Sequence, residues 1–293
     1  MADGGLNDLP PEPVSLYWRP TVKRGAILYV TLAGLLGLAC HHLPPRLGFA
    51  APATEEGPVF IWDAANDPYL AELRATWSLE RLRGPTDLDT VRAVNGWVSS
   101  LWQHDGDSVP KQSDPASILA EVRQGGRFRC VEYAIVVKGC LSALGIPSRV
   151  LGLMTSDVET RRSGAGHAVA EAYLRDRSAW VMVDGQWNAM PFLRGAPLSA
   201  VGLQEALATS PADVTFEGLP VSRWRSYQAW VAPYLFYFSA PRDNRTSGLD
   251  PAPGQFILVP AGADAPKVFQ GRVAIKATTV RSVGSIYPPV ASP

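Results

Sequence analysis

The sequence predicts an α+β fold in which a helix packs on an antiparallel sheet, and three observations carry this prediction. A largely apolar run from Cys130 to Leu144 has the length and spacing of a buried helix. Residues 167–174 alternate His, Val, Glu and Tyr with Ala, Ala, Ala and Leu, which is the period of a strand. Residues 179–184 are rich in Trp and Val and follow a polar turn, so they predict a second strand and a β-hairpin.

Glycines mark both ends of the predicted helix. Gly125 and Gly126 interrupt any earlier helix, whereas Gly145 and Pro147 end the one that starts near Cys130. Cys130 would then lie in the first turn, where unpaired backbone N–H groups and the positive end of the helix dipole favour a thiolate. The same N–H groups could bind the oxyanion of a tetrahedral intermediate. Cys130 is therefore a candidate nucleophile.

His167 opens the first predicted strand and Asp184 closes the second. A hairpin would return Asp184 to within a few residues of His167. We expect Asp184 to accept the Nδ1 proton of His167 and so to hold the ring for Cys130. A nucleophile, a base and a residue that orients the base are what nucleophilic acyl transfer requires. Cys130, His167 and Asp184 are the candidate catalytic residues.

These segments resemble the transglutaminase-like superfamily, whose members share a papain-like Cys-His-Asp arrangement. The resemblance covers roughly residues 70–200. Its features are the Cys130 helix, the exit Gly145-Ile146-Pro147-Ser148-Arg149, the Gly166-His167 strand start, the strand Trp180 to Asp184, and upstream segments Thr86 to Leu101 and Asp114 to Gly125. One departure is Gly185, since proline is common in the family after the Asp. The resemblance implies a transglutaminase-like core with Cys130 at a helix N-terminus.

The resemblance also implies a function. The protein is expected to be a cysteine acyltransferase or hydrolase that acts on amide bonds of protein or peptide substrates through a thioester at Cys130. An amine acceptor would give crosslinking and water would give hydrolysis. The alternative is a non-catalytic envelope protein that uses the same cleft to bind peptide or cell-wall polymer. No acidic cluster resembles a Ca²⁺ loop, so we expect neither metal nor cofactor.

A second oxyanion donor is harder to identify. Gln124 lies six residues before Cys130, as the glutamine of papain-like enzymes does. Trp97, Trp102 and Gln103, on and after the preceding predicted helix, are rival candidates. The sequence leaves this choice open.

Composition excludes other classes of function. The chain has 27 basic and 27 acidic side chains and no basic stripe, so nucleic-acid binding is not expected. Three cysteines do not form a disulfide framework. Cys130 and Cys140 would lie roughly 15 Å apart along one helix, whereas a disulfide needs Cα atoms within about 7 Å. We therefore expect Cys140 to be a core residue.

The apolar residues 25–40 predict a signal anchor or signal peptide, which would attach the protein to a membrane. Lys23 and Arg24 precede the run and favour a cytoplasmic N-terminus, with an extracytoplasmic catalytic domain, periplasmic or at the cell surface. Cys40 follows Gly37-Leu38-Ala39, an imperfect lipoprotein site. We expect an uncleaved anchor; lipidation at Cys40, ordinary cleavage and a buried core helix are the alternatives.

Five segments are expected along the chain. They are a disordered tail at 1–24, the signal segment at 25–40, a linker at 41–60, a transglutaminase-like domain at 61–205 and a small β-rich C-terminal extension at 206–293. Two segments of the sequence can each be interpreted in two ways. The aromatic stretch 216–238 is either core packing or a carbohydrate or peptide platform, and Arg161-Arg162, in a charged loop before His167, is either solvated or selects acidic substrates.

Overall fold

A computed structural model describes residues 45–50, 59–246, 254–288 and 290 of the chain. The helices are α1 (Pro68–Thr76), α2 (Asp87–Leu101), α3 (Pro115–Arg123), α4 (Cys130–Ala143), α5 (Ala200–Thr209), α6 (Trp224–Val231) and α7 (Val283–Ile286), with 3₁₀ turns η1 (Leu79–Leu82), η2 (Pro211–Asp213), η3 (Val221–Arg223) and η4 (Ala232–Tyr234). The strands are β1 (Ser148–Met154), β2 (Gly166–Leu174), β3 (Ala179–Val183), β4 (Met190–Leu193), β5 (Ala196–Pro197), β6 (Val214–Glu217), β7 (Tyr237–Pro241), β8 (Gln255–Leu258), β9 (Val268–Phe269), β10 (Val273–Ala274) and β11 (Thr278–Val280).

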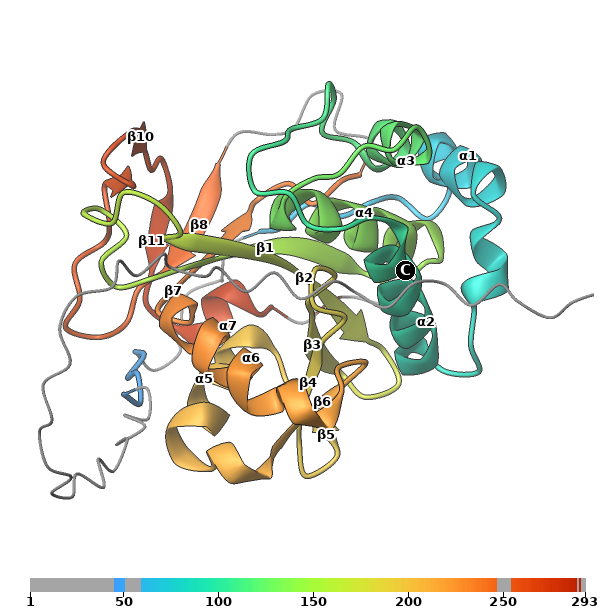
Figure 1. The fold of residues 1–293 in the computed structure, drawn as a ribbon. Coiled ribbons are helices and arrows are strands. Elements are labelled where there is room, and N and C mark those ends of the chain that lie inside the picture. Colours follow the sequence, from blue (N-terminus) through green and yellow to red (C-terminus); the bar gives the residue numbers. More distant parts are fainter. Residues whose placement is uncertain (1–44, 51–58, 247–253, 289, 291–293) are drawn as a thin grey trace, which may run out of the picture. The chain divides into compact units, whose positions relative to one another are not determined.

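A six-stranded sheet lies at the centre of the described residues, in the order β11-β8-β7-β1-β2-β3 (Figure 1). Every neighbouring pair in it is antiparallel except β11 and β8, which are parallel. Two smaller sheets have the orders β5-β4-β6 and β10-β9. The predicted α+β class with a largely antiparallel sheet is confirmed.

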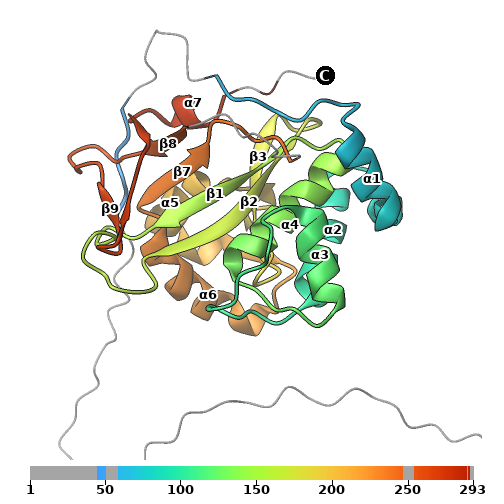
Figure 2. The same cartoon turned by 90° about the horizontal axis from the view of Figure 1, so that it is seen from above.

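The two faces of β2 serve two different hydrophobic cores. Ala170, Ala172 and Leu174 belong to a core built with α1 to α4. Val169, on the alternate face, belongs to a second core with α5 and α6. Figures 1 and 2 show the two groups of helices on opposite sides of the sheet. Small alanine side chains let α4 lie close to β2, and this brings the start of α4 to the start of the strand.

Helix α4 has the bounds that the sequence pattern predicts. It begins at Cys130, and the chain turns out of it at Gly145, whose φ of 78° is the left-handed conformation that glycine adopts without strain. Cys140 lies in the middle of the helix, is 0% exposed and packs in the first core, as expected. Burial raises the pKa of the Cys140 thiol, so it is an unreactive core residue.

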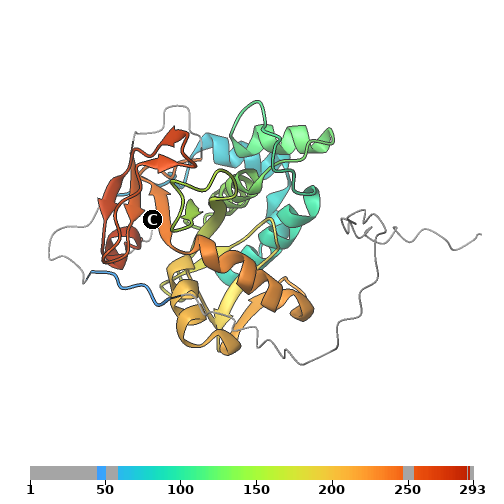
Figure 3. The ribbon, with the colours of Figure 1, turned by 60° about the vertical axis from the view of Figure 1, so that its left-hand side comes forward.

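The last third of the chain completes the central sheet. Strand β7 pairs with β1 through Gly152↔Ser239 and Leu153↔Phe238, and β8 and β11 extend the sheet beyond it. Figure 3 shows this C-terminal part, in red, at the edge away from the helices coloured cyan and green. Pairing with β7 satisfies the free edge of β1. The described residues from 45 onward form one compact unit, in which those after residue 205 are continuous with those before it.

Part of the predicted linker is also paired with the C-terminal residues. The Ala50 backbone N–H donates to the carbonyl of Arg281 at 2.8 Å, and the Gly48 carbonyl accepts from Ala261 at 2.7 Å. The Gln204 amide on α5 donates to the Pro45 carbonyl at 2.7 Å. Residues 45–50 therefore lie along the folded unit.

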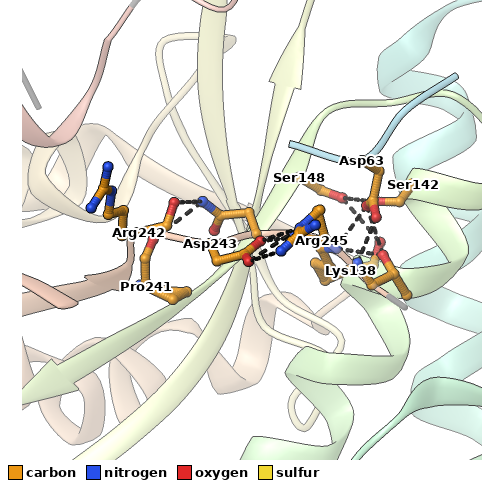
Figure 4. A network of polar contacts seen from close by, with 10 residues as sticks. Asp63, Lys138, Ser142, Ser148, Pro241, Arg242, Asp243 and Arg245 are labelled. Atoms are coloured by element: carbon orange, nitrogen blue, oxygen red, sulfur yellow. Dashed lines mark hydrogen bonds and ion pairs between the residues drawn. The ribbon is translucent and has the colours of Figure 1, made fainter. Parts of the chain in front are cut away.

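A buried polar network fastens α4 to two distant segments (Figure 4). Lys138 of α4 forms an ion pair with Asp63 at 2.8 Å and a hydrogen bond with Thr246. The Thr246 hydroxyl also donates to Asp63 at 2.7 Å. On the same side, the Ser148 hydroxyl donates to the Lys138 carbonyl at 3.0 Å. Because burial is costly for a lone charge, the pairing of Lys138 with Asp63 allows both to lie inside.

A second ion pair is fully enclosed beside the sheet. Arg149 of β1 and Glu171 of β2 are both 0% exposed and lie 2.7 Å apart. The guanidinium lies between Trp180 and Tyr287, 4.5 Å from each ring, and also donates to the Ile286 carbonyl. Loss of one member of such a pair typically costs about 3–5 kcal/mol. The pair therefore ties the C-terminal turn to the sheet.

The predicted tail 1–24 and signal segment 25–40 lie outside the described residues, as do Cys40 and the cations before the apolar run. Within the part of the chain that the structure describes, no helix is both long and apolar enough to cross a bilayer. The membrane attachment remains a prediction.

Candidate active site

Cys130 is the first residue of α4 and is half-buried. Two residues into the helix, the fully buried Glu132 carboxylate accepts the backbone N–H of Arg129 at 3.0 Å and its guanidinium at 2.6 Å. The Glu132 carboxylate thus caps the helix at Arg129, the residue before Cys130, and leaves the N–H of Cys130 free of this contact. Helix geometry leaves the N–H groups of the first turn, including that of Cys130, without partners inside the helix. They form a positive environment for a thiolate or an oxyanion.

His167 and Asp184 are brought together by the β2–β3 hairpin. The pairing of Ala170 with Val183 brings the end of β3 next to the start of β2. His167 Nε2 lies 2.8 Å from Asp184 Oδ2. The His167 side chain is 2% exposed and that of Asp184 is 0% exposed. The structure also places His167 close enough to Cys130 for the imidazole to lower the pKa of the thiol.

The nitrogen of His167 that meets Asp184 differs from the expected one. We expected Asp184 to hold Nδ1, and this expectation was wrong, because the carboxylate contacts Nε2. A carboxylate only accepts hydrogen bonds, so Nε2 carries the proton and Nδ1 is left for Cys130. Nδ1 is the ring nitrogen nearer the β2 backbone, and the next backbone N–H along β2, that of Ala168, also lowers the pKa of the Cys130 thiol.

The electrostatics of the pair favour a thiolate and an imidazolium. Burial raises the pKa of the Cys130 thiol, but the hydrogen bond and charge of His167 and the Ala168 N–H outweigh burial and bring the pKa below its ordinary value. Burial lowers the pKa of His167, but the charge and hydrogen bond of Asp184, together with Cys130, raise it to about 10. Both shifts favour the ion pair of thiolate and imidazolium over the pair of neutral groups.

Four donors surround the Asp184 carboxylate. Oδ1 accepts the backbone N–H groups of Gln186 at 3.1 Å and Trp187 at 3.3 Å. Oδ2 accepts His167 Nε2–H and the hydroxyl of Tyr227, both at 2.8 Å. The carboxylate is therefore held on both oxygens by the turn after β3 and by helix α6.

Aromatic side chains from α6 and η4 cover the His167 ring. Trp230 meets it edge-on with ring centroids 4.9 Å apart, and Tyr234 lies at 6.0 Å. From the sequence we interpreted this stretch as core or as a platform, and its contact with the site was not predicted. The spacing of Tyr227, Trp230 and Tyr234 is i, i+3, i+7, which puts them on one helical face and is the signal that could have found them.

The four candidate oxyanion donors differ in their hydrogen-bond partners and surroundings. The Gln124 amide donates to the Ala120 carbonyl of its own helix at 3.2 Å, and the Trp102 indole N–H donates to Phe128 at 3.3 Å. Trp97 lines a separate cavity of about 430 Å³ with Trp77. Gln103 is exposed and is the remaining member of the set.

His104, which the sequence analysis did not single out, lies close to the site. Partial burial and the charge of His167 lower the pKa of His104, which favours its neutral form. The charges of Asp184 and Glu132 also act on it. A neutral imidazole next to the site can donate one hydrogen bond to a substrate and accept one from it.

The loop before His167 forms another side of the site. Burial raises the pKa of Tyr234, and the charges of Arg161 and Cys130 shift it in opposite directions, so the phenol lies within range of both. Arg161 itself pairs with Asp157 at 3.0 Å, and both are exposed. This pairing agrees with the solvated interpretation of Arg161, and selection of acidic substrates stays untested.

Gly185, the departure from the family pattern, has a packing reason. A Cβ at this position would lie 3.1 Å from Tyr133 Cβ and Val137 Cγ2, both on α4. Glycine therefore lets the turn that carries Asp184 approach the helix closely. Among the described residues no group of three His, Cys, Asp or Glu side chains could share a metal ion. The absence of a metal or cofactor remains a prediction.

Comparison with known proteins supports the resemblance. Residues 79–185 match the model of the transglutaminase-like superfamily, a segment that holds Cys130, His167 and Asp184. The resemblance predicted for this part of the chain is thus confirmed. No curated protein matches the chain.

Three solved structures are similar over part of the chain. A candidate cysteine protease from Cytophaga hutchinsonii has 17% identity and a TM-score of 0.27, with 44% of this chain and 40% of that protein covered. A candidate protease from Parabacteroides distasonis has 16% identity, a TM-score of 0.28, and 37% and 22% covered. Red sea bream transglutaminase has 18% identity, a TM-score of 0.27, and 41% and 24% covered. The chain spans less than half the length of each.

Proposed function

We propose that this chain, whose residues 79–185 match the transglutaminase-like superfamily, is a cysteine acyltransferase or hydrolase that acts on amide bonds of protein or peptide substrates. One observation carries the proposal. The Cys130 thiol at a helix N-terminus adjoins a histidine whose other nitrogen is 2.8 Å from a buried carboxylate. This is the combination of nucleophile, acid–base group and orienting residue that covalent acyl transfer uses.

In the first half of the proposed reaction, the Cys130 thiolate attacks the amide carbonyl carbon and a tetrahedral oxyanion forms. The backbone N–H groups at the start of α4 stabilise that oxyanion. The His167 imidazolium gives its Nδ1 proton to the departing nitrogen, which leaves as ammonia or an amine. A thioester remains on Cys130.

In the second half, neutral His167 takes a proton from the acceptor, and the acceptor attacks the thioester carbonyl. A primary amine yields a new amide, and water yields a carboxylic acid. Cys130 leaves as a thiolate and His167 is again an imidazolium. Asp184 accepts the Nε2–H hydrogen bond of His167 in both halves and stabilises the charge that returns to the ring.

The test of the proposal is the pH dependence of thiol alkylation. The rate of Cys130 alkylation by iodoacetamide, followed by mass spectrometry, should have its midpoint below that of an ordinary thiol near 8.5, because His167 stabilises the thiolate. Cys140 should react only after unfolding and is the internal control. A midpoint at or above the ordinary value refutes the proposal and favours a non-catalytic binding protein.

We also propose that residues 25–40 attach the protein to a membrane, with the Cys130 domain on the extracytoplasmic side. The proposal is supported by Lys23 and Arg24 before the apolar run. A reporter fused after Pro293 should be active only if it functions outside the cytoplasm, and activity of a cytosolic reporter overturns the orientation. Intact mass distinguishes an uncleaved anchor from a chain that starts at an acylated Cys40.

A further inference from the structure

Tyr227 makes a contact with the site that the three predicted residues do not explain. It lies on α6, 42 residues beyond the end of the family match, and is 0% exposed. Its hydroxyl donates to Asp184 Oδ2 at 2.8 Å, the same oxygen and the same distance as His167 Nε2. The two donors therefore share one carboxylate oxygen.

The position of the Tyr227 hydroxyl is held by ring packing. The ring lies 5.0 Å from Phe216, 5.6 Å from Trp187 and 5.9 Å from Trp230. Trp230 also packs on His167, so one cluster holds both donors to Oδ2. Burial and the charge of Asp184 raise the pKa of Tyr227 well above its ordinary value, so it remains a protonated donor.

We propose that Tyr227 is a positioning residue for the Cys130–His167–Asp184 site, which it serves by fixing Asp184 Oδ2 and sharing it with His167. The inference rests on the proposed function. Without the hydroxyl, Oδ2 would keep only His167 as a donor, and the carboxylate would be held mainly through Oδ1. The ring of His167 would then be oriented less firmly toward Cys130.

The shared oxygen also tunes His167. The hydroxyl directs the positive end of its dipole at Oδ2 and so offsets part of the carboxylate charge that His167 experiences. Its removal leaves more of that charge for the imidazolium, which makes the ring harder to deprotonate. The other titratable groups that face the His167 site are Cys130, Asp184, Tyr234 and His104. None of them changes in a Tyr227 variant.

The test is Tyr227→Phe, which keeps the ring and removes only the hydroxyl. We expect kcat of acyl transfer to an amine to fall on the order of 10-fold, the loss typical of a hydrogen bond to a charged group. KM should change little. The alkaline limb of the kcat profile should move to higher pH, as should the titration of the His167 imidazole followed by NMR.

Tyr287→Phe is the matched control, because Tyr287 also donates to an enclosed carboxylate, Glu171 at 2.8 Å, but outside the site. It should lower thermal stability and leave both pH profiles unchanged. Unchanged kcat and an unchanged alkaline limb in folded Tyr227→Phe overturn the inference. If wild-type Cys130 shows an ordinary alkylation midpoint, the proposed function has failed instead, and the two failures are thus distinguishable.

A measurement on the wild-type protein covers the case in which Tyr227→Phe does not fold. A buried, hydrogen-bonded hydroxyl should give a slowly exchanging proton resonance with a nuclear Overhauser effect to the His167 Nε2 proton. Observation of this pair supports the shared oxygen. If the hydroxyl resonance is absent at low temperature while the Nε2 proton is visible, the shared carboxylate oxygen is contradicted.

Discussion

Replacement of Cys130 by alanine should abolish acyl transfer while the protein stays folded. The thiol is the only group in the proposed reaction that forms a covalent bond to substrate. Removal of the nucleophile in a comparable triad lowers kcat by about 10⁶-fold, so turnover should fall below detection. The side chain is half-buried at the first turn of α4 and its loss leaves the core intact. Circular dichroism and the release of p-nitrophenolate from an activated acyl ester measure the two outcomes.

Cys140→Ala is the control for this variant. Cys140 lies on the same helix, is 0% exposed and packs in the first core, so its loss should cost stability but not activity. Residual turnover of more than a few per cent in folded Cys130→Ala, with the activity of Cys140→Ala preserved, would show that another group is the nucleophile.

The elements that carry the three predicted residues could be read from local sequence. Helix α4 starts and stops where glycines and Pro147 interrupt the apolar run, and β2 and β3 follow the alternation and the polar turn. Local rules suffice here because each boundary is set by the conformational preferences of a few adjacent residues. The helix with Cys130 at its start and the hairpin with His167 and Asp184 were predictable for that reason.

Contacts between distant segments could not be predicted in this way. Strand β7 lies beside β1 although more than eighty residues separate them, and no local pattern specifies that pairing. The contact of Tyr227 with Asp184 was unpredictable for the same reason. Trp224, Trp230 and Tyr234 lie nearby in sequence, and only the fold selects which aromatic side chain meets the carboxylate. The enclosed pair of Arg149 and Glu171 likewise depends on both faces of the sheet being covered.

The orientation of the His167 ring shows a further limit of sequence reasoning. From the order of residues we expected Asp184 to hold Nδ1 of His167, but that order does not determine which nitrogen the carboxylate meets. That depends on where the sulfur and the carboxylate lie relative to the backbone of β2, which only the fold determines. The chemistry is preserved with either nitrogen, because one holds the carboxylate and the other exchanges the proton with Cys130.

Asp184→Asn should preserve substrate binding and lower kcat, by up to about 10⁴-fold as in the serine-protease triad. The structure explains why the amide cannot replace the carboxylate. Four donors converge on the two carboxylate oxygens, and asparagine has only one oxygen. With its oxygen toward His167, the amide NH₂ faces two backbone N–H groups. With its NH₂ toward His167, the proton must move to Nδ1, which faces the thiolate.

The pH profile gives Asp184→Asn a distinctive signature. The Asp184 charge raises the pKa of His167 to about 10, so the imidazolium that protonates the leaving group is present below that pH and is lost above it. Without the charge this pKa falls, and the alkaline limb of kcat should move to lower pH, opposite to the shift expected for Tyr227→Phe. Asp213→Asn, which breaks only an exposed pair with Arg194, is the control and should leave the profile unchanged. An alkaline limb that stays in place in folded Asp184→Asn would mean that Asp184 does not act on His167, and the acid–base part of the proposed reaction would have to be reassigned.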